Sequence, residues 1–250
     1  MELKEANILL VEDEPFLREI MGAWLERVVG RVFSAENGRE AAKILTANKN
    51  KIDLIISDVR MPVMDGIELL KRINASSARR PGMIFITGFS DLTLREAFEM
   101  GVEAILEKPI KREELLQVAK TCLADVEELW QSHAGAAPET QLKAAFSSFA
   151  VAVREKRIGF GRRGFCIKLS EALREGPVEF AIEFRDERMV LSGWGLVRWI
   201  APEEAMAGIE ITYLDQPSRD WVIAHLKKTK PLAFIPSSPG LDRLLQSKVA

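Results

Sequence analysis

The sequence predicts two domains, an open α/β domain with a parallel sheet followed by a smaller β domain. The first half alternates short apolar runs with amphipathic segments five times, which is typical of a parallel sheet with helices on both faces. The second half consists mainly of strand-like segments punctuated by glycine, which is typical of antiparallel strands joined by turns. A length of 250 residues is ample for two such domains.

The first domain is expected to span residues 1–128. Its apolar runs are short and continuous, as in strands buried on both faces of a sheet. We expect strands at 7–11, 31–35, 53–57, 83–87 and 103–107, and helices at 15–28, 39–47, 66–73, 93–100 and from 112 onward. In open α/β sheets the functional crevice lies beyond the carboxyl ends of the strands, so we expect the chemistry there.

Residues 129–156 are interpreted as a linker that contains an amphipathic helix. The segment QSHAGAAPET is rich in small residues, and its proline, Pro138, is suited to the first turn of a helix. Apolar residues then recur at spacings of four, three and four, as on one helix face: Leu142, Phe146, Phe149 and Val153. This stripe either packs on a flanking domain or forms the seam of a homodimer.

The second domain is expected at residues 157–235, followed by a tail at 236–250. Strands are expected at 165–169, 178–184, 189–200 and 207–214, and a helix at 218–230 with Ser218 as its cap. These segments predict a small antiparallel β-barrel with a terminal helix.

The composition favours a cytoplasmic protein that does not bind membranes. A net charge of −2 gives no overall attraction to polyanions or anionic lipids. No apolar run is long enough to cross a bilayer, and the start MELKEANILLVEDEP does not have the pattern of a signal peptide. The two cysteines, Cys122 and Cys166, stand far apart without neighbouring metal ligands, which suits a reducing compartment.

Conventional enzyme activity and DNA binding are not expected. His133 and His225 have no nucleophile or acid at motif spacing. After the linker there is no recognition-helix pattern, and the positive charge of the last helix is confined to KKTK.

Five polar residues follow or end the strands of the first domain. Glu12 and Asp13 end the first strand, Asp58 the third and Thr87 the fourth, and Lys108 follows the fifth. Because the strands are expected to be parallel, all five should lie at one sheet edge. Three carboxylates there would repel one another, and a hard cation such as Mg²⁺ would relieve this repulsion. A lysine and a hydroxyl beside them suit phosphoryl oxygens.

This set, in this order, resembles the receiver domains of bacterial two-component response regulators. The matching segments are LLVEDEP, ISDVRMPVMDGIEL, FITGFSD and ILEKP, and they cover about half of the chain. The resemblance implies a doubly wound, flavodoxin-like fold that is phosphorylated by a histidine kinase or phosphotransfer protein. It implies no enzyme activity beyond Mg²⁺-dependent phosphorylation and dephosphorylation of the domain itself.

The resemblance also assigns a role to each residue of the set. Asp58 would be the phosphoacceptor, and the metal ligands would be Glu12, Asp13, Asp58 and the backbone carbonyl of Arg60. Thr87 and Lys108 would bind the phosphoryl oxygens, and Pro109 would follow a cis peptide bond.

One position departs from the receiver pattern. Receivers usually have two switch positions, a hydroxyl residue and an aromatic residue. Thr87 stands at the first position in this sequence, but Ile105 stands at the second, where the aromatic residue is expected. We therefore expect phosphorylation to be retained. The signal should leave through the helix before Gly101, or through the last helix and its linker.

The second domain resembles PilZ domains, small β-barrels best known as receptors for cyclic di-GMP. The resemblance rests on LSGWGLVRW and AGIEITYLDQPSRDWVIAHL, in which these positions match: Gly195, Val197, Trp199, Gly208 and Ile209. It covers about seventy residues, from the glycine-punctuated strands through the Ser218 helix.

The ligand-binding signature of PilZ domains is only partly present. The first arginine pair, Arg154 and Arg157, is spaced by three residues where the family has four. The turn GFGRRG keeps only Gly164 of the family's motif, but Arg162 and Arg163 in it could capture a phosphate. The alternative is a solvated turn with basic flanks.

The favoured function is a phosphorylation-controlled adaptor whose PilZ-like domain contacts an unknown protein partner. The first alternative is a dual receptor that also binds cyclic di-GMP, and the second is a DNA-binding regulator.

Overall fold

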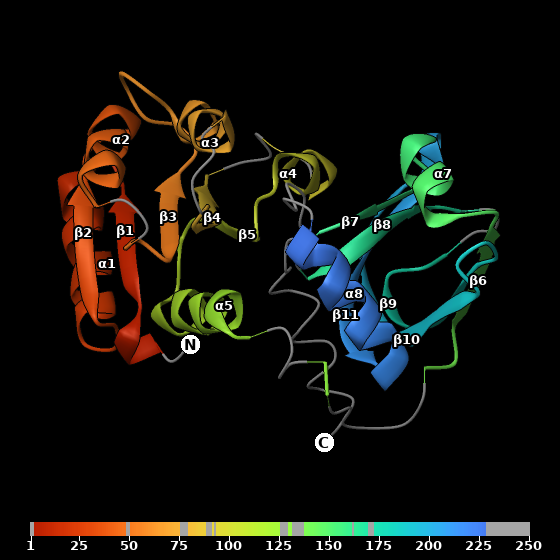
Figure 1. Ribbon diagram of the computed structural model, residues 1–250. Coiled ribbons are helices and arrows are strands. Elements are labelled where there is room, and N and C mark those ends of the chain that lie inside the picture. The colour runs from red at the N-terminus through yellow and green to blue at the C-terminus, as the bar shows by residue number, and fades with distance from the viewer. Residues whose placement is uncertain are drawn as a thin grey trace. The chain divides into compact units, whose positions relative to one another are not determined.

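The computed structural model describes residues 3–48, 51–75, 80–88, 92, 94–125, 130–131, 138–161, 163–169 and 173–228 (Figure 1). Its contacts divide the chain into two compact units. The first comprises Met1–Thr93 and Val102–Ala124, and the second comprises Leu94–Gly101 and Asp125–Ala250. The short helix α4 (Leu94–Met100) is therefore grouped with the second unit. The predicted tail at 236–250, His133 and Arg162 lie outside the described residues.

The first unit contains a five-stranded sheet in the order β2-β1-β3-β4-β5. Every pairing in it is parallel, which confirms the predicted sheet. The strands are β1 (Asn7–Val11), β2 (Arg31–Ala35), β3 (Leu54–Asp58), β4 (Gly82–Thr87) and β5 (Ala104–Glu107). The helices of this unit are α1 (Pro15–Glu26), α2 (Gly38–Ala47), α3 (Gly66–Ala75) and α5 (Arg112–Leu123), after a short 3₁₀ turn, η1 (Leu3–Glu5).

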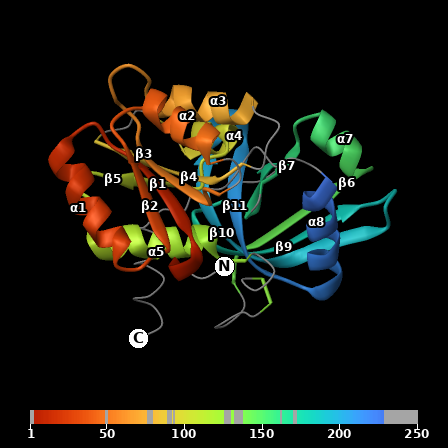
Figure 2. The ribbon, with the colours of Figure 1, turned by 60° about the vertical axis from the view of Figure 1, so that its left-hand side comes forward.

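Helices cover both faces of this sheet, α1 with α5 on one face and α2 with α3 on the other (Figures 1 and 2). Strands β3 and β4 are buried along their whole length, as expected for strands covered on both sides. Local signals start the helices: Pro15 occupies the first turn of α1, and the Asn37 side chain accepts the amide of Glu40 at the start of α2. Glu40 in turn accepts the amide of Glu36 at 2.9 Å, in the manner of a capping box.

The second unit contains a six-stranded sheet in the order β6-β9-β10-β11-β8-β7. The strands are β6 (Gln141–Phe146), β7 (Ile158–Phe160), β8 (Gly164–Lys168), β9 (Gly176–Phe184), β10 (Met189–Ala201) and β11 (Met206–Leu214). A 3₁₀ turn, η2 (Pro202–Glu204), joins β10 to β11. Besides α4, the described helices of this unit are α7 (Phe149–Arg154) and α8 (Gln216–Lys228).

This sheet corrects the prediction of a closed antiparallel barrel. Strand β6 pairs with β9 in parallel, so the sheet is mixed, and β6 and β7 are its two edges. The other pairings are antiparallel as expected. The reason is that β6 comes from the segment interpreted as a linker, and it joins the sheet beside β9.

The predicted linker helix is therefore wrong. Residues 141–146 form a strand in which Leu142, Ala144 and Phe146 face the core in alternation, and only the short α7 follows. The last residue of the stripe, Val153, is 41% exposed. A homodimer seam along a continuous helix consequently has no structural basis.

The core of the second unit is rich in aromatic side chains. Phe165, Phe180 and Phe184 are almost fully buried, and Trp221 of α8 stacks on Phe184 at 5.5 Å between ring centroids. Helix α8 begins two residues before the predicted start. Its cap is Asp215, whose Oδ1 accepts the Ser218 amide at 2.8 Å, while the buried Ser218 hydroxyl accepts the amide of Ser192 at 2.8 Å.

Candidate functional site

Three carboxylates meet at the carboxyl edge of the parallel sheet. Glu12 and Asp13 follow β1 and Asp58 ends β3, and each offers an oxygen within 4.8 Å of the others. Glu12 and Asp58 are buried, whereas Asp13 is exposed. The residues lie far apart in sequence, but neighbouring parallel strands end at the same edge and so bring them together.

Lys108 reaches into this cluster from the loop after β5. Its Nζ lies 2.5 Å from Oδ2 of Asp58 and 3.1 Å from Oε2 of Glu12. The Lys108–Pro109 peptide bond is cis, as predicted. The ammonium group therefore compensates part of the negative charge of the cluster.

The charges perturb one another. Burial, and after it the negative charge of Asp58, raises the pKa of Glu12 above its ordinary value, although Lys108 opposes this shift. Burial alone would lower the pKa of Lys108, but the hydrogen bonds and charges of Asp58 and Glu12 outweigh it and raise that pKa. A proton on Glu12 is therefore easier to retain than on an exposed glutamate, and Lys108 stays charged at neutral pH.

The backbone around Asp58 fixes its position. The amide of Arg60 donates to Oδ1 of Asp58 at 3.0 Å, and the amide of Gly66 donates to the carbonyl of Val59 at 3.0 Å. A Cβ at Gly66 would lie 2.4 Å from the Asp58 carbonyl oxygen. Only glycine allows the start of α3 to approach the end of β3 this closely.

The two predicted switch positions lie on adjacent strands. Thr87 ends β4 at the same edge and is buried, and the neighbouring Lys108 amide donates to its carbonyl at 2.8 Å. Ile105 is partly buried in β5 and pairs with Phe85. It thus lies two residues before the strand end that is level with Thr87.

One residue of the site was missed in the sequence. The Arg18 guanidinium, in the first turns of α1, donates to the backbone carbonyls of Glu12 at 2.6 Å and Asp13 at 3.2 Å. The available signal was a basic residue near the start of the helix that follows the acidic pair. Arg18 holds the backbone that carries these two carboxylates.

The arginines proposed for phosphate capture have different surroundings. The Arg157 guanidinium lies 4.8 Å above the ring of Phe146, and Arg154 ends α7. Arg163 is buried, 3.7 Å from Oε1 of Glu210. The sequence had also given no sign that Arg198 would be buried there, with its Nε donating to Oε2 of Glu210 at 2.6 Å.

The family of response regulator receiver domains matches residues 8–120. The chain is 35% identical over 123 residues to the transcriptional regulatory protein GlrR of Escherichia coli. The aligned region covers 49% of this chain and 27% of that protein. It is 35% identical over 117 residues to the positive alginate biosynthesis regulatory protein of Pseudomonas aeruginosa, which covers 46% of each. The chain thus matches about a quarter to a half of the length of these relatives.

Among solved structures, the chemotaxis response regulator CheY4 of Vibrio cholerae is 31% identical. That match covers 48% of this chain and 99% of CheY4, with a TM-score of 0.42. Within the part of the chain that the structure describes, no helix has the length and apolar character to span a membrane. The family match and the parallel five-stranded fold agree on the same residues, and the N-terminal half of this chain is a response regulator receiver domain.

Proposed function

We propose that Asp58 accepts a phosphoryl group from a histidine kinase or a phosphotransfer protein. The observation that carries this proposal is the contact of Asp58 with Lys108 at 2.5 Å inside the acidic cluster. In the transfer, a carboxylate oxygen of Asp58 bonds to phosphorus while the bond from phosphorus to the donor histidine nitrogen breaks. The product is an acyl phosphate, and the imidazole leaves with the electron pair of the broken bond.

The donor set fits a small divalent cation. Three carboxylates and one ammonium give the ionised cluster a formal charge of −2, and oxygen-only ligands suit Mg²⁺. The residues that would hold it are Glu12, Asp13, Asp58 and, through its backbone carbonyl, Arg60. When bound, Mg²⁺ neutralises charge as an anionic phosphoryl group approaches.

The remaining residues of the site would bind the phosphoryl group and hold the metal ligands in position. Lys108, released from one of its two carboxylate partners, would pair with a phosphoryl oxygen as a point charge. Thr87 would donate its hydroxyl to another phosphoryl oxygen. Arg18 would keep the Glu12–Asp13 backbone in place through its two hydrogen bonds.

The test uses beryllofluoride, a phosphoryl mimic, and acetyl phosphate, a small phosphoryl donor. With Mg²⁺ present, the wild-type chain should bind beryllofluoride by fluorine NMR and gain a phosphate that alkali and hydroxylamine release, as expected of an acyl phosphate, and Asp58→Asn should do neither. Asp65→Asn is the matched control, because Asp65 lies in the following loop and accepts the Glu68 amide at 2.7 Å, which asparagine also can. Phosphorylation of the Asp58→Asn variant to the wild-type level would show the proposal to be wrong.

For the second unit, we propose a degenerate PilZ-like domain that passes the signal on by contact with another protein. Cyclic di-GMP is the alternative ligand. The contacts of Arg157 with Phe146 and of Arg163 with Glu210 favour the protein-binding role, because both guanidiniums already have partners. Calorimetric titration with cyclic di-GMP, with and without beryllofluoride, should give no heat; saturable binding lost in Arg163→Gln would favour the receptor.

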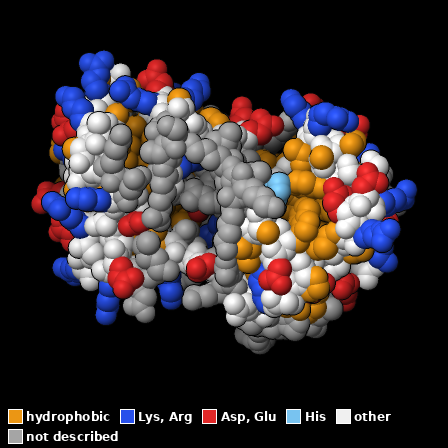
Figure 3. Space-filling view, in the orientation of Figure 1, with side chains coloured by type: hydrophobic (Ala, Val, Ile, Leu, Met, Phe, Trp, Pro, Cys, Tyr) orange, Lys and Arg blue, Asp and Glu red, His pale blue; other side chains and the backbone are white. Residues whose placement is uncertain are grey.

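DNA binding is a further alternative, because relatives are named as transcriptional regulators. The likeness to them covers only about the first half of this chain. On the face seen in Figure 3, basic and acidic side chains are interspersed. Mobility shifts on random DNA over a salt series should show no salt-dependent complex.

A further inference from the structure

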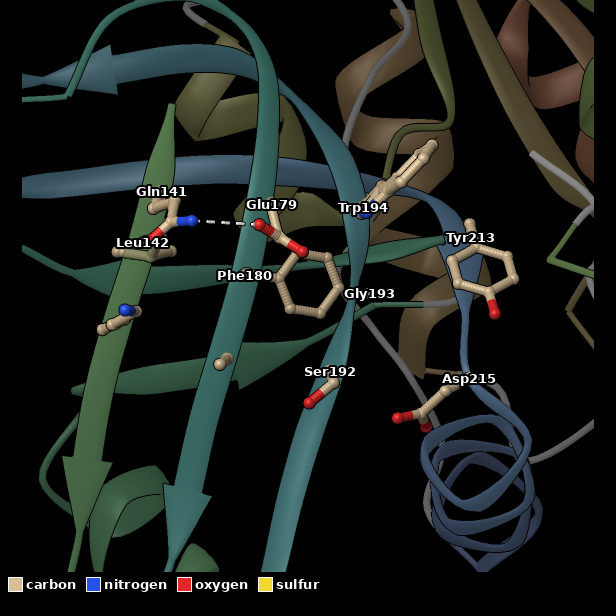
Figure 4. A pocket seen from close by; sticks show the side chains of 11 residues that line it. Gln141, Leu142, Glu179, Phe180, Ser192, Gly193, Trp194, Tyr213 and Asp215 are labelled. Atoms are coloured by element: carbon tan, nitrogen blue, oxygen red, sulfur yellow. Dashed lines mark hydrogen bonds between the residues drawn. The ribbon is translucent and has the colours of Figure 1, made fainter. Parts of the chain in front are cut away.

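A groove of about 350 Å³ crosses four strands of the mixed sheet (Figure 4). Its lining residues come from β6, β9, β10 and the end of β11, and Asp215 lies between β11 and α8. On β9, Glu179 points into the groove while its neighbours Val178 and Phe180 are buried in the core. The groove is therefore lined mainly by residues that alternate with the core residues, together with Leu142, Phe180 and Gly193 from the core-facing positions.

One side of the groove is aromatic. Trp194 of β10 and Tyr213 of β11 are cross-strand partners, with ring centroids 5.9 Å apart and planes tilted by 60°. The register shifts between Trp194 and Gly195, so the two rings stand next to a bulge. Both side chains are partly exposed. They offer a π surface to whatever enters the groove.

The charged side chains that line the groove are mostly acidic. Glu179 is oriented by the Gln141 amide, which donates to its Oε2 at 3.2 Å (Figure 4). Asp215 is fixed by the hydrogen bond from the Ser218 amide that starts α8. With Lys143 as the basic lining residue, the formal charge of the lining is −1.

We propose that this groove binds an arginine or lysine side chain of a basic segment on a partner protein. A guanidinium can stack on the Trp194 and Tyr213 rings and pair with the Glu179 or Asp215 carboxylate at the same time. A purely apolar ligand would leave these carboxylates poorly solvated, which disfavours it. The inference rests on the proposed protein-contact role of the second unit and names the chemistry of the partner; it does not depend on Asp58.

The experiment titrates the full-length protein with the peptide acetyl-Gly-Arg-Gly-Arg-Gly-amide by calorimetry. The matched peptide has citrulline in place of arginine, which keeps the shape and removes the charge. Arginine peptide should bind saturably and citrulline peptide should not. Trp194→Ala and Glu179→Gln should each weaken binding about five- to tenfold. Glu183→Gln is the control, because Glu183 lies on the same strand, half exposed, beside Arg185 and outside the groove.

Trp194→Phe keeps a ring and should retain most of the binding, so it separates loss of the aromatic surface from loss of folding. Absence of binding by the arginine peptide and by the same peptide with lysine in place of arginine, equal binding of the citrulline peptide, or equal effects of Glu179→Gln and Glu183→Gln would each overturn the proposal. Binding of a neutral oligosaccharide instead would assign the aromatic surface to a different ligand. Asp58→Asn should bind the peptide normally, so a failure of phosphorylation and a failure of the groove remain distinguishable.

Discussion

The two sheets of this chain build their sites in different ways. In the receiver domain, Glu12, Asp58 and Lys108 come from different strand ends and meet because parallel strands finish at one edge. In the mixed sheet, Glu179 and Trp194 come from the middle of strands and Tyr213 from near the end of one, and they meet on a face. An edge site depends only on where strands end, whereas a face site depends on strand order and register. The first can be predicted from one sequence, and the second cannot.

The largest effect is expected in the second unit, where Arg198 is buried against Glu210. Arg198→Met should destabilise this unit by up to about 3–5 kcal/mol, because the buried carboxylate loses its closest cation and retains Arg163 at 3.7 Å. Arg185→Met is the matched control: Arg185 pairs with Glu183 at 3.6 Å with both side chains at least half exposed, and such pairs contribute about 0–1 kcal/mol. Urea unfolding of the two variants should separate them; equal midpoints would mean that Arg198 contributes no more than a surface pair.

In the receiver domain, Gly66→Ala should lower the free energy of unfolding by about 2–3 kcal/mol and weaken beryllofluoride binding. The added Cβ would lie 2.4 Å from the Asp58 carbonyl oxygen, so the end of β3 has to move. Gly22→Ala is the control, since a Cβ in that part of α1 meets nothing within 4 Å. It should be neutral or stabilising by up to about 1 kcal/mol. Normal beryllofluoride binding by Gly66→Ala would show that the edge geometry is more tolerant than the contact indicates.

Residues at the sheet edge of the receiver domain were easier to predict from the sequence than residues on the face or in the core of the mixed sheet. The edge residues Glu12, Asp58 and Lys108 could be predicted because strand ends are visible as the limits of apolar runs. Leu142 and Phe146 misled because a spacing of four fits both a helix turn and the two-residue repeat of a strand. Trp194 and Tyr213 could not be paired because a bulge shifts their register. Arg198 gave no signal because its burial depends on Glu210, which comes from another strand.

Lys108→Gln should have a smaller effect and lower the free energy of unfolding by about 1–2 kcal/mol without Mg²⁺. The loss is limited because the Lys108 side chain is a quarter exposed. The carboxylates then repel without compensation, so Mg²⁺ should raise the melting temperature more in this variant than in the wild type. The pKa of Lys108 is raised by folding, so its stabilisation should be present at neutral pH and lost only as pH rises through that raised pKa. An equal Mg²⁺ effect in both proteins would argue against the charge balance.

The smallest effects should come from helix caps, and they should be alike in the two units. Asn37→Ala at α2 and Asp215→Ala at α8 each remove one acceptor for a helix amide. Each should cost about 1 kcal/mol in thermal or urea unfolding. Asp215→Ala should in addition weaken binding of the arginine peptide, and Asn37→Ala should leave that binding unchanged. A cost at α8 well above that at α2 would indicate that the end of β11 depends on this cap.

The position of strand β6 in the chain also affects the order in which the mixed sheet forms and opens. It pairs with β9 across 38 residues of chain, as between Gln141 and Glu179, while β9, β10 and β11 follow one another directly. Long loop closure is slow and costs entropy, and β6 is an edge strand with β9 as its single neighbour among the described strands, so it should join the sheet later than the β9–β10–β11 segment and leave it earlier. Its amides should exchange with solvent faster than those of β10. Because Gln141 and Lys143 line the groove, a bound peptide should slow that exchange, and its residence time would then be tied to the opening of this edge.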